Sequence, residues 1–168
     1  MSSKLQNLSH DKGDSTVQAS QLKLNSIRIS IIRSDWNDRI TSALEKGCVE
    51  HLIKKGVLKK NILQNRVPGS FELIYAAAHF NKLKTFDAII CLGCIIKGET
   101  PHFNYIAQAV SNGLSILNTQ GETPVIFGVL TTDNLAQAKA RAGGKYGNKG
   151  VEAAMTALEM ITIKREIK

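Results

Sequence analysis

The sequence contains no long hydrophobic run and only three cysteines. None of its apolar stretches approaches the roughly 20 residues that a membrane-spanning helix requires. The N-terminus also lacks the apolar core of a secretory signal peptide. An odd number of cysteines without such a signal argues against a disulfide framework. These absences predict a cytoplasmic protein that does not associate with membranes.

Two of the cysteines, Cys91 and Cys94, form a C-x-x-C pattern. This spacing occurs in zinc sites and in redox centres. However, Cys91 lies within an apolar, strand-like run, and no second pair of Cys or His residues stands at zinc spacing. Free cysteine commonly packs as a small hydrophobic residue. We therefore predict no metal site, with redox or metal chemistry at this pair as the alternative.

Aromatic residues are few and charge is unbalanced. Only 5% of the residues are aromatic, and 22 Lys and Arg against 14 Asp and Glu give a formal net charge of +8. Such an excess is compatible with phosphate-bearing substrates, with nucleic acid or with simple solubility. No cluster of Lys and Arg with interleaved aromatics indicates a nucleic-acid groove. We therefore expect no nucleic-acid partner.

The pattern of polar and apolar residues predicts one domain with a tail. Residues 1–25 are polar and mixed in charge, a composition that cannot bury enough surface to offset the entropy of ordering. We predict a flexible tail over 1–25 and a single domain over 26–168, in which apolar strands alternate with amphipathic helices. This alternation predicts an α/β fold, a three-layer, flavodoxin-like α/β/α sandwich around a central four-stranded parallel sheet. The strands are expected at 27–33, about 61–67, 87–92 and 123–130.

The loop after the third strand carries the residues best suited to chemistry. In an open parallel sheet such loops lie at the carboxyl ends of the strands, where ligands bind, and a helix N-terminus attracts anions. Gly98 permits close backbone approach and Thr100 offers a hydroxyl. His102 stands in the first helical turn, whose dipole favours the neutral imidazole that accepts a proton. We predict a proton-transfer role for His102. The alternative is an ordinary connection with Thr100 as N-cap and Pro101 as first helical residue.

Other candidates are expected near the same edge of the sheet. Trp36 follows the first strand and provides either a packing residue or a flat surface for an aromatic ligand. Ser70, Phe71 and Glu72 follow the second strand, where Ser70 is a candidate cap and Glu72 a first-turn acid favoured by the dipole. Arg141 ends a short helix, where a cation is favourable. The glycine-rich segment 143–150 matches neither the P-loop nor the dinucleotide-binding fingerprint.

Five motifs follow one another along the chain: Pro68–Glu72, Gly98–Phe103, Phe127–Thr132, Arg141–Gly143 and Gly147–Gly150. Their combination resembles the lumazine synthase family of riboflavin biosynthesis over about residues 27 to 163. The resemblance implies an enzyme that condenses 5-amino-6-ribitylaminopyrimidinedione with 3,4-dihydroxy-2-butanone 4-phosphate. The products are 6,7-dimethyl-8-ribityllumazine, phosphate and water, and no metal or redox cofactor is implied.

The same resemblance implies a role for each site residue. His102 is the proton-transfer residue. The phosphate is held by Gly98, Glu99, Thr100 and Arg141, although an acid such as Glu99 in a phosphate loop is expected to repel the ligand. The pyrimidine and ribityl groups meet Trp36, Ser70, Phe71, Glu72, Cys94, Ile95, Ile96, Phe127 and Lys149. The family supplies three of these positions, Phe127, Arg141 and Lys149, from an adjacent subunit.

The resemblance also implies self-association. The family forms pentamers and, in many members, sixty-subunit icosahedral capsids with riboflavin synthase as the enclosed partner. The segment Gly143–Asn148 resembles the capsid-forming members, which favours a capsid. Two non-enzymatic hypotheses stay open, a basic module that binds RNA or a flavin nucleotide and a purely structural shell protein.

Overall fold

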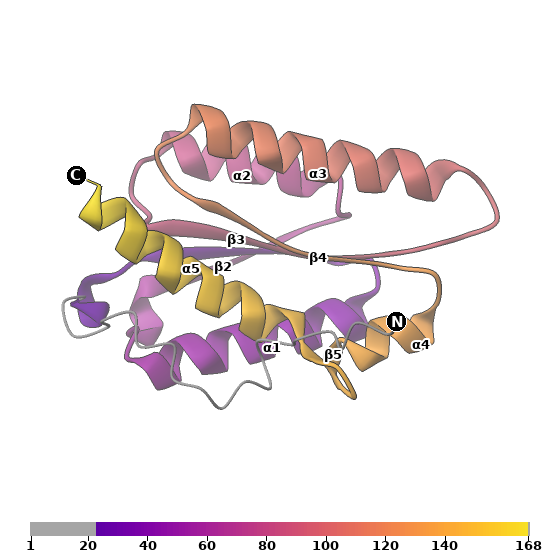
Figure 1. The fold of residues 1–168 in the computed structure, drawn as a ribbon, viewed down its shortest axis with the longest axis horizontal. Coiled ribbons are helices and arrows are strands. Elements are labelled where there is room, and N and C mark those ends of the chain that lie inside the picture. The colour runs from indigo at the N-terminus through magenta and orange to yellow at the C-terminus, as the bar shows by residue number, and fades with distance from the viewer. Residues whose placement is uncertain (1–22, 168) are drawn as a thin grey trace, which may run out of the picture.

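A four-stranded parallel sheet lies between two layers of helices (Figure 1). The structure, a computed structural model, describes residues 23–167. The strand order is β2-β1-β3-β4, and every neighbouring pair is parallel. This confirms the predicted α/β class and the central four-stranded sheet. The strands are β1 (Ile29–Ser34), β2 (Ile62–Val67), β3 (Ala88–Ile96) and β4 (Val125–Thr132).

The long helices pair on opposite faces of the sheet. In Figure 1, α2 and α3 lie together above the sheet, and α1 and α5 cross its lower face. These helices are α1 (Asp38–Lys55), α2 (Glu72–Lys82), α3 (His102–Gln120) and α5 (Lys149–Glu166). The smaller elements are the 3-10 helices η3 (Leu24–Ser26) and η4 (Lys59–Asn61), the short helix α4 (Leu135–Ala140), and the antiparallel strands β5 (Ala142–Gly144) and β6 (Gly147–Asn148).

Only the last residues of the predicted tail fall within the described part of the chain. Leu24 packs against the core below the sheet, and residues 1–22 lie outside the described range. No helix between residues 23 and 167 is long and apolar enough to cross a membrane.

The core has two layers because both faces of the sheet are covered. Successive strand residues point to opposite faces of the sheet. Ile90 and Leu92 of β3 therefore belong to the core layer between the sheet and helices α1 and α5, while Ile89 and Cys91 belong to the layer between the sheet and helices α2 and α3. Near-continuous apolar runs are typical of parallel strands buried on both sides. This explains why β3 and β4 could be recognised from their composition.

The C-x-x-C pair is divided between these layers. Cys91 packs under α2 and α3, whereas Cys94 belongs to the opposite layer. An odd spacing along a strand places two side chains on opposite faces, so this pair shares no site. Burial raises the pKa of Cys91 to about 12 and that of Cys94 to about 11. Both therefore act as small apolar side chains, as the packing interpretation predicts.

Gly150 lies at the close approach of α5 to α1. A Cβ at this position would collide with the main-chain carbonyl of Leu44. We expect Gly150→Ala to lower the free energy of unfolding by about 2 kcal/mol, because overpacking forces the two helices apart. Urea unfolding followed by circular dichroism measures this change. The control is Gly98→Ala, since nothing lies within 4 Å of a Cβ built there. Equal destabilisation by both substitutions would contradict the interpretation.

Candidate active site

A pocket of about 560 Å³ opens at the carboxyl ends of β1, β2 and β3. The chain leaves β1 toward β2 on one side and continues from β3 to β4 on the other, so the pocket lies where the strand order reverses. This is the place where open α/β sheets bind ligands. The pocket is lined by Trp36, Gly69, Ser70, Phe71, Glu72, Cys94, Ile95, Ile96, Gly98, Thr100, His102, Phe103 and Ile106.

Most of the predicted site residues meet in this one pocket. Trp36 comes from the turn after β1, and residues 70–72 come from the turn after β2 and the first position of α2. The end of β3 contributes residues 94–96, the loop after it Gly98 and Thr100, and the start of α3 His102. Glu99 belongs to the same loop but is exposed and does not line the pocket. Phe127, Arg141 and Lys149 also lie outside the lining.

The two candidate capping residues do not cap their helices. The N-cap positions of α2 and α3 are Phe71 and Pro101, and neither helix has a side-chain cap. Ser70 is therefore not the cap for which it was a candidate, and the alternative interpretation of Thr100 as an N-cap is wrong, because each residue stands one position before the N-cap. Their side chains instead contribute polar groups to the pocket wall.

The pocket is open to solvent in a single chain. The side chains of Trp36 and Phe71 are 74% and 50% exposed, and His102 is exposed at the start of α3. Exposed aromatic side chains that gather at a pocket mouth are typical of binding surfaces. The arrangement therefore provides an aromatic surface and a histidine in the same pocket.

A cluster of charged side chains surrounds Arg141. Both terminal nitrogens of Arg141 contact the Glu152 carboxylate at 3.0 Å, and Nη1 also donates to the Tyr146 carbonyl at 2.9 Å. Lys149 Nζ contacts the same carboxylate at 3.3 Å. Two cations share one buried carboxylate, so the cluster keeps a net positive charge suited to an anion. Sequence reasoning missed Glu152, although its place three residues after Lys149 on α5 is a signal for such a pair.

Phe127 and Lys149 line a second, separate pocket of about 720 Å³, which lies between the C-terminal end of α3, the length of α5 and the edge strand β4. The two pockets share no lining residue. The second pocket is largely apolar, with Met160 and Ile163 among its walls. A single chain therefore holds Phe127, Arg141 and Lys149 apart from the aromatic surface and His102.

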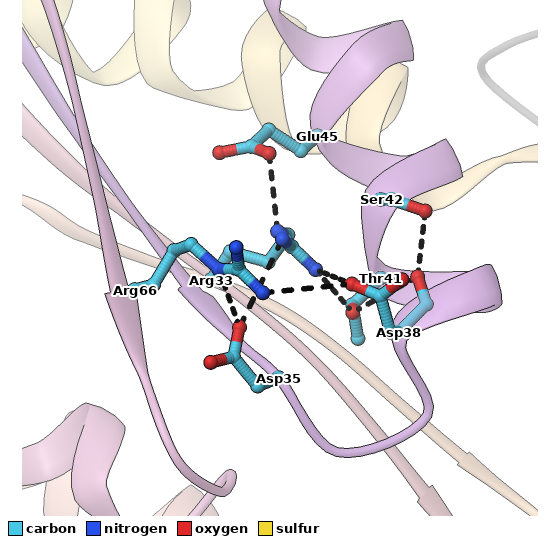
Figure 2. A network of polar contacts seen from close by, with 7 residues as sticks. All are labelled: Arg33, Asp35, Asp38, Thr41, Ser42, Glu45 and Arg66. Atoms are coloured by element: carbon cyan, nitrogen blue, oxygen red, sulfur yellow. Dashed lines mark hydrogen bonds and ion pairs between the residues drawn. The ribbon is translucent and has the colours of Figure 1, made fainter.

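The turn from β1 to α1 is held by a network of ion pairs (Figure 2). At its centre, Arg33 is almost fully buried in β1. Its Nη1 lies 2.7 Å from Asp38 Oδ1 and its Nε lies 3.0 Å from Glu45 Oε2. Arg66 of β2 joins the network through Asp35, with 2.6 Å between Nε and Oδ1. The network therefore ties β1, β2 and α1 together beside Trp36.

Comparison with known proteins identifies the family. The family described as 6,7-dimethyl-8-ribityllumazine synthase matches residues 26–165. The chain belongs to this family. The Porphyromonas gingivalis protein of that name is 50% identical over 139 residues, 83% of this chain and 86% of the relative. The Cytophaga hutchinsonii protein of the same name is 50% identical over 153 residues, 91% of this chain and 96% of the relative. The one from Parabacteroides distasonis is 45% identical over 161 residues, 96% and 98% of the two chains.

The pH dependence of stability tests the ion-pair network of this lumazine synthase family member. The hydrogen bond from Arg33 lowers the pKa of the Asp38 carboxyl. A lowered pKa in the folded state stabilises the fold above the ordinary pKa near 4, and this contribution is lost as the pH falls further. We expect Asp38→Asn to lower the melting temperature at pH 7, and the difference from wild type to shrink below about pH 4.

Differential scanning fluorimetry between pH 3 and pH 7 measures this difference. The control is Glu50→Gln, because Glu50 belongs to an exposed ion pair with Lys46 at 3.9 Å, and such pairs contribute little. A difference between wild type and Asp38→Asn that stays constant over the whole range would count against the assignment.

Proposed function

We propose that this chain is a lumazine synthase. It condenses 5-amino-6-ribitylaminopyrimidinedione with 3,4-dihydroxy-2-butanone 4-phosphate, the penultimate step of riboflavin biosynthesis. The observation that carries the proposal is the single pocket in which Trp36, Phe71, Glu72 and His102 meet, in a chain of this family.

The chemistry needs a proton carrier, an anion site and orientation. The amine adds to the ketone and loses water to give an imine. A proton then leaves carbon as phosphate departs, and the enol that results rearranges to a ketone. The ribityl-bearing nitrogen adds to this ketone, and loss of a second water closes the ring. His102, exposed at the pocket wall, is the group that moves the proton. Holding two substrates in contact supplies much of the remaining acceleration.

The pyrimidine and ribityl groups occupy the aromatic side of the pocket. Trp36 offers its ring for stacking, at a mouth that Phe71 also lines. The strand end 94–96 lines the wall beside it, where main-chain groups can pair with the edge of the pyrimidine. Glu72 supplies a carboxylate that accepts hydrogen bonds from ribityl hydroxyls, and Ser70 a hydroxyl.

The phosphate is bound by the loop before α3 together with Arg141. Gly98 and Thr100 line the pocket, and the backbone of this loop approaches the N-terminus of α3, which favours an anion. Glu99 contributes its main chain, since its side chain is not part of the pocket wall. Arg141 presents a guanidinium fork that Glu152 orients and Lys149 supports.

A neighbouring subunit supplies Arg141, Phe127 and Lys149. Two observations support this proposal, the separation of these residues from the first pocket within one chain and the partial exposure of Phe127, 38%, on the edge strand β4. The assembly that completes the site is a pentamer. Segment 143–148 forms the β5–β6 hairpin. Its resemblance to the capsid-forming members of the family favours an icosahedral capsid with riboflavin synthase inside.

Product formation tests the reaction. Wild type is expected to develop the absorbance of the lumazine product when both substrates are present. His102→Ala is expected to lower turnover about a hundredfold without abolishing it, because positioning survives. Arg141→Ala is expected to raise the KM for butanone phosphate about thirtyfold. Lys139→Ala removes an exposed cation from the last turn of α4, two residues before Arg141, and serves as the control. No product from folded, assembled wild type would favour the structural shell protein instead.

Mixed assemblies test whether the site is shared. The proposed site takes His102 from one subunit and Arg141 from the next subunit around the ring. In a mixed ring, such a site is intact where an Arg141→Ala chain supplies His102 and the next chain, His102→Ala, supplies Arg141. Random mixing of equal amounts therefore restores about a quarter of the sites. With butanone phosphate well below its wild-type KM, where each variant alone keeps only a few per cent of the activity, we expect the co-refolded mixture to exceed the mean activity of the two variants about tenfold. Activity equal to that mean, with co-assembly shown by sedimentation, would contradict a shared site.

A further inference from the structure

The orientation of Trp36 is not determined by its own packing. The side chain is 74% exposed, although it lines the pocket together with His102. An exposed side chain on a free turn would sample many positions and lose entropy when a ligand orders it. The position of this ring therefore depends on how firmly its neighbours in the chain are held.

The residue before Trp36 is anchored to β2 and to the buried Arg33. The Asp35 carboxylate contacts Arg66 Nε at 2.6 Å and Arg33 Nη2 at 3.8 Å. The main chain adds two hydrogen bonds to the end of β2, from Asp35 N to the Val67 carbonyl at 2.8 Å and from Trp36 N to the Pro68 carbonyl at 3.0 Å.

The residue after Trp36 is anchored to β3. Asn37 adopts a left-handed backbone with φ of 62°, a conformation that Asn tolerates better than most residues. Its side-chain amide donates to the Cys94 carbonyl at 2.8 Å, at the wall of the same pocket. On the far side of this turn, Asp38 and Glu45 of α1 hold the Arg33 guanidinium (Figure 2).

We propose that this ion-pair network positions Trp36 for stacking on the pyrimidine. The network comprises Arg33, Asp35, Asp38, Glu45 and Arg66. The proposal rests on the proposed function, in which Trp36 binds that substrate. These five are positioning residues, because none of them lines the pocket. A turn held on both sides of Trp36 presents the ring already ordered, so less entropy is lost when the ligand binds.

The test uses Trp36 as its own probe, because it is the only tryptophan in the sequence. The variants are Asp35→Asn and Arg66→Met, whose wild-type side chains are 43% and 61% exposed and so are not needed to fill the core. We expect each to lower the steady-state fluorescence anisotropy of Trp36 and to raise its quenching by acrylamide. We also expect the KM for the pyrimidine to rise about threefold to fivefold, with kcat changed less than twofold.

Three further proteins separate positioning from general damage. Arg66→Lys keeps the charge and is expected to recover at least half of the loss in pyrimidine KM. The double variant, Asp35→Asn with Arg66→Met, is expected to lose less than the sum of the two single losses, because the contact between Asp35 and Arg66 is common to both. Lys84→Met removes an exposed ion pair with Glu122 in the connection between α2 and β3, and is expected to leave Trp36 and the kinetics unchanged.

The outcomes distinguish the two proposals. The positioning role is overturned if folded Asp35→Asn and Arg66→Met have the same Trp36 anisotropy, the same acrylamide quenching and the same pyrimidine KM as wild type. If wild type forms no product, the proposed reaction fails, and positioning is decided by Trp36 anisotropy and by quenching of its fluorescence on titration with the pyrimidine alone. Quenching at a lower pyrimidine concentration in wild type than in both variants would support the positioning role, and quenching at equal concentrations would overturn it.

Discussion

The parallel pairing of β1 with β3 is the constraint on which the site depends. The chain leaves these adjacent strands in opposite directions across the sheet, so the connections diverge and leave a crevice at the carboxyl edge. Trp36 and His102 are distant in the sequence but line the same pocket there. Both strands are buried between the helix layers, so the walls of the crevice rest on the two layers of the hydrophobic core.

The edge strand β4 explains why one chain holds the pieces of the proposed site apart. Its outer side has no strand partner within the described residues, and Phe127 and the adjoining apolar pocket face that side. The cations near this edge, Arg141 and Lys149, are oriented by Glu152 rather than by the pocket beside His102. In the proposed assembly, an anion site already ordered on one subunit closes the open pocket of the next, so little has to rearrange on association.

Local sequence patterns were sufficient to predict the main strands and helices and most of the residues that line the pocket. The strands β3 and β4 were predicted from their apolar runs. The glycine, proline and aromatic residues after the strands correctly predicted that the pocket lies at the carboxyl edge of the sheet. Capping by residue type was wrong for Ser70 and Thr100, because a suitable side chain does not determine where the helical backbone begins. The pairs of Arg33 with Glu45 and of Arg66 with Asp35 depend on how α1 and β2 sit against β1. No local pattern encodes that packing, and Arg33 in a strand otherwise looks like a solvent-facing residue.

A buried arginine in a fully buried strand calls for a physical explanation other than stability. Burying the Arg33 guanidinium costs about as much as its attraction to the carboxylates around it returns, so an apolar side chain in its place would serve the fold at least as well. An ion pair differs from apolar packing in its directionality, because each contact sets an angle as well as a distance. The five charged side chains fix the turn between β1 and α1 in one orientation, and the residue carried at its tip is Trp36. The cost of burying Arg33 is therefore better understood as the cost of an ordered aromatic surface at the pocket than as a contribution to the core.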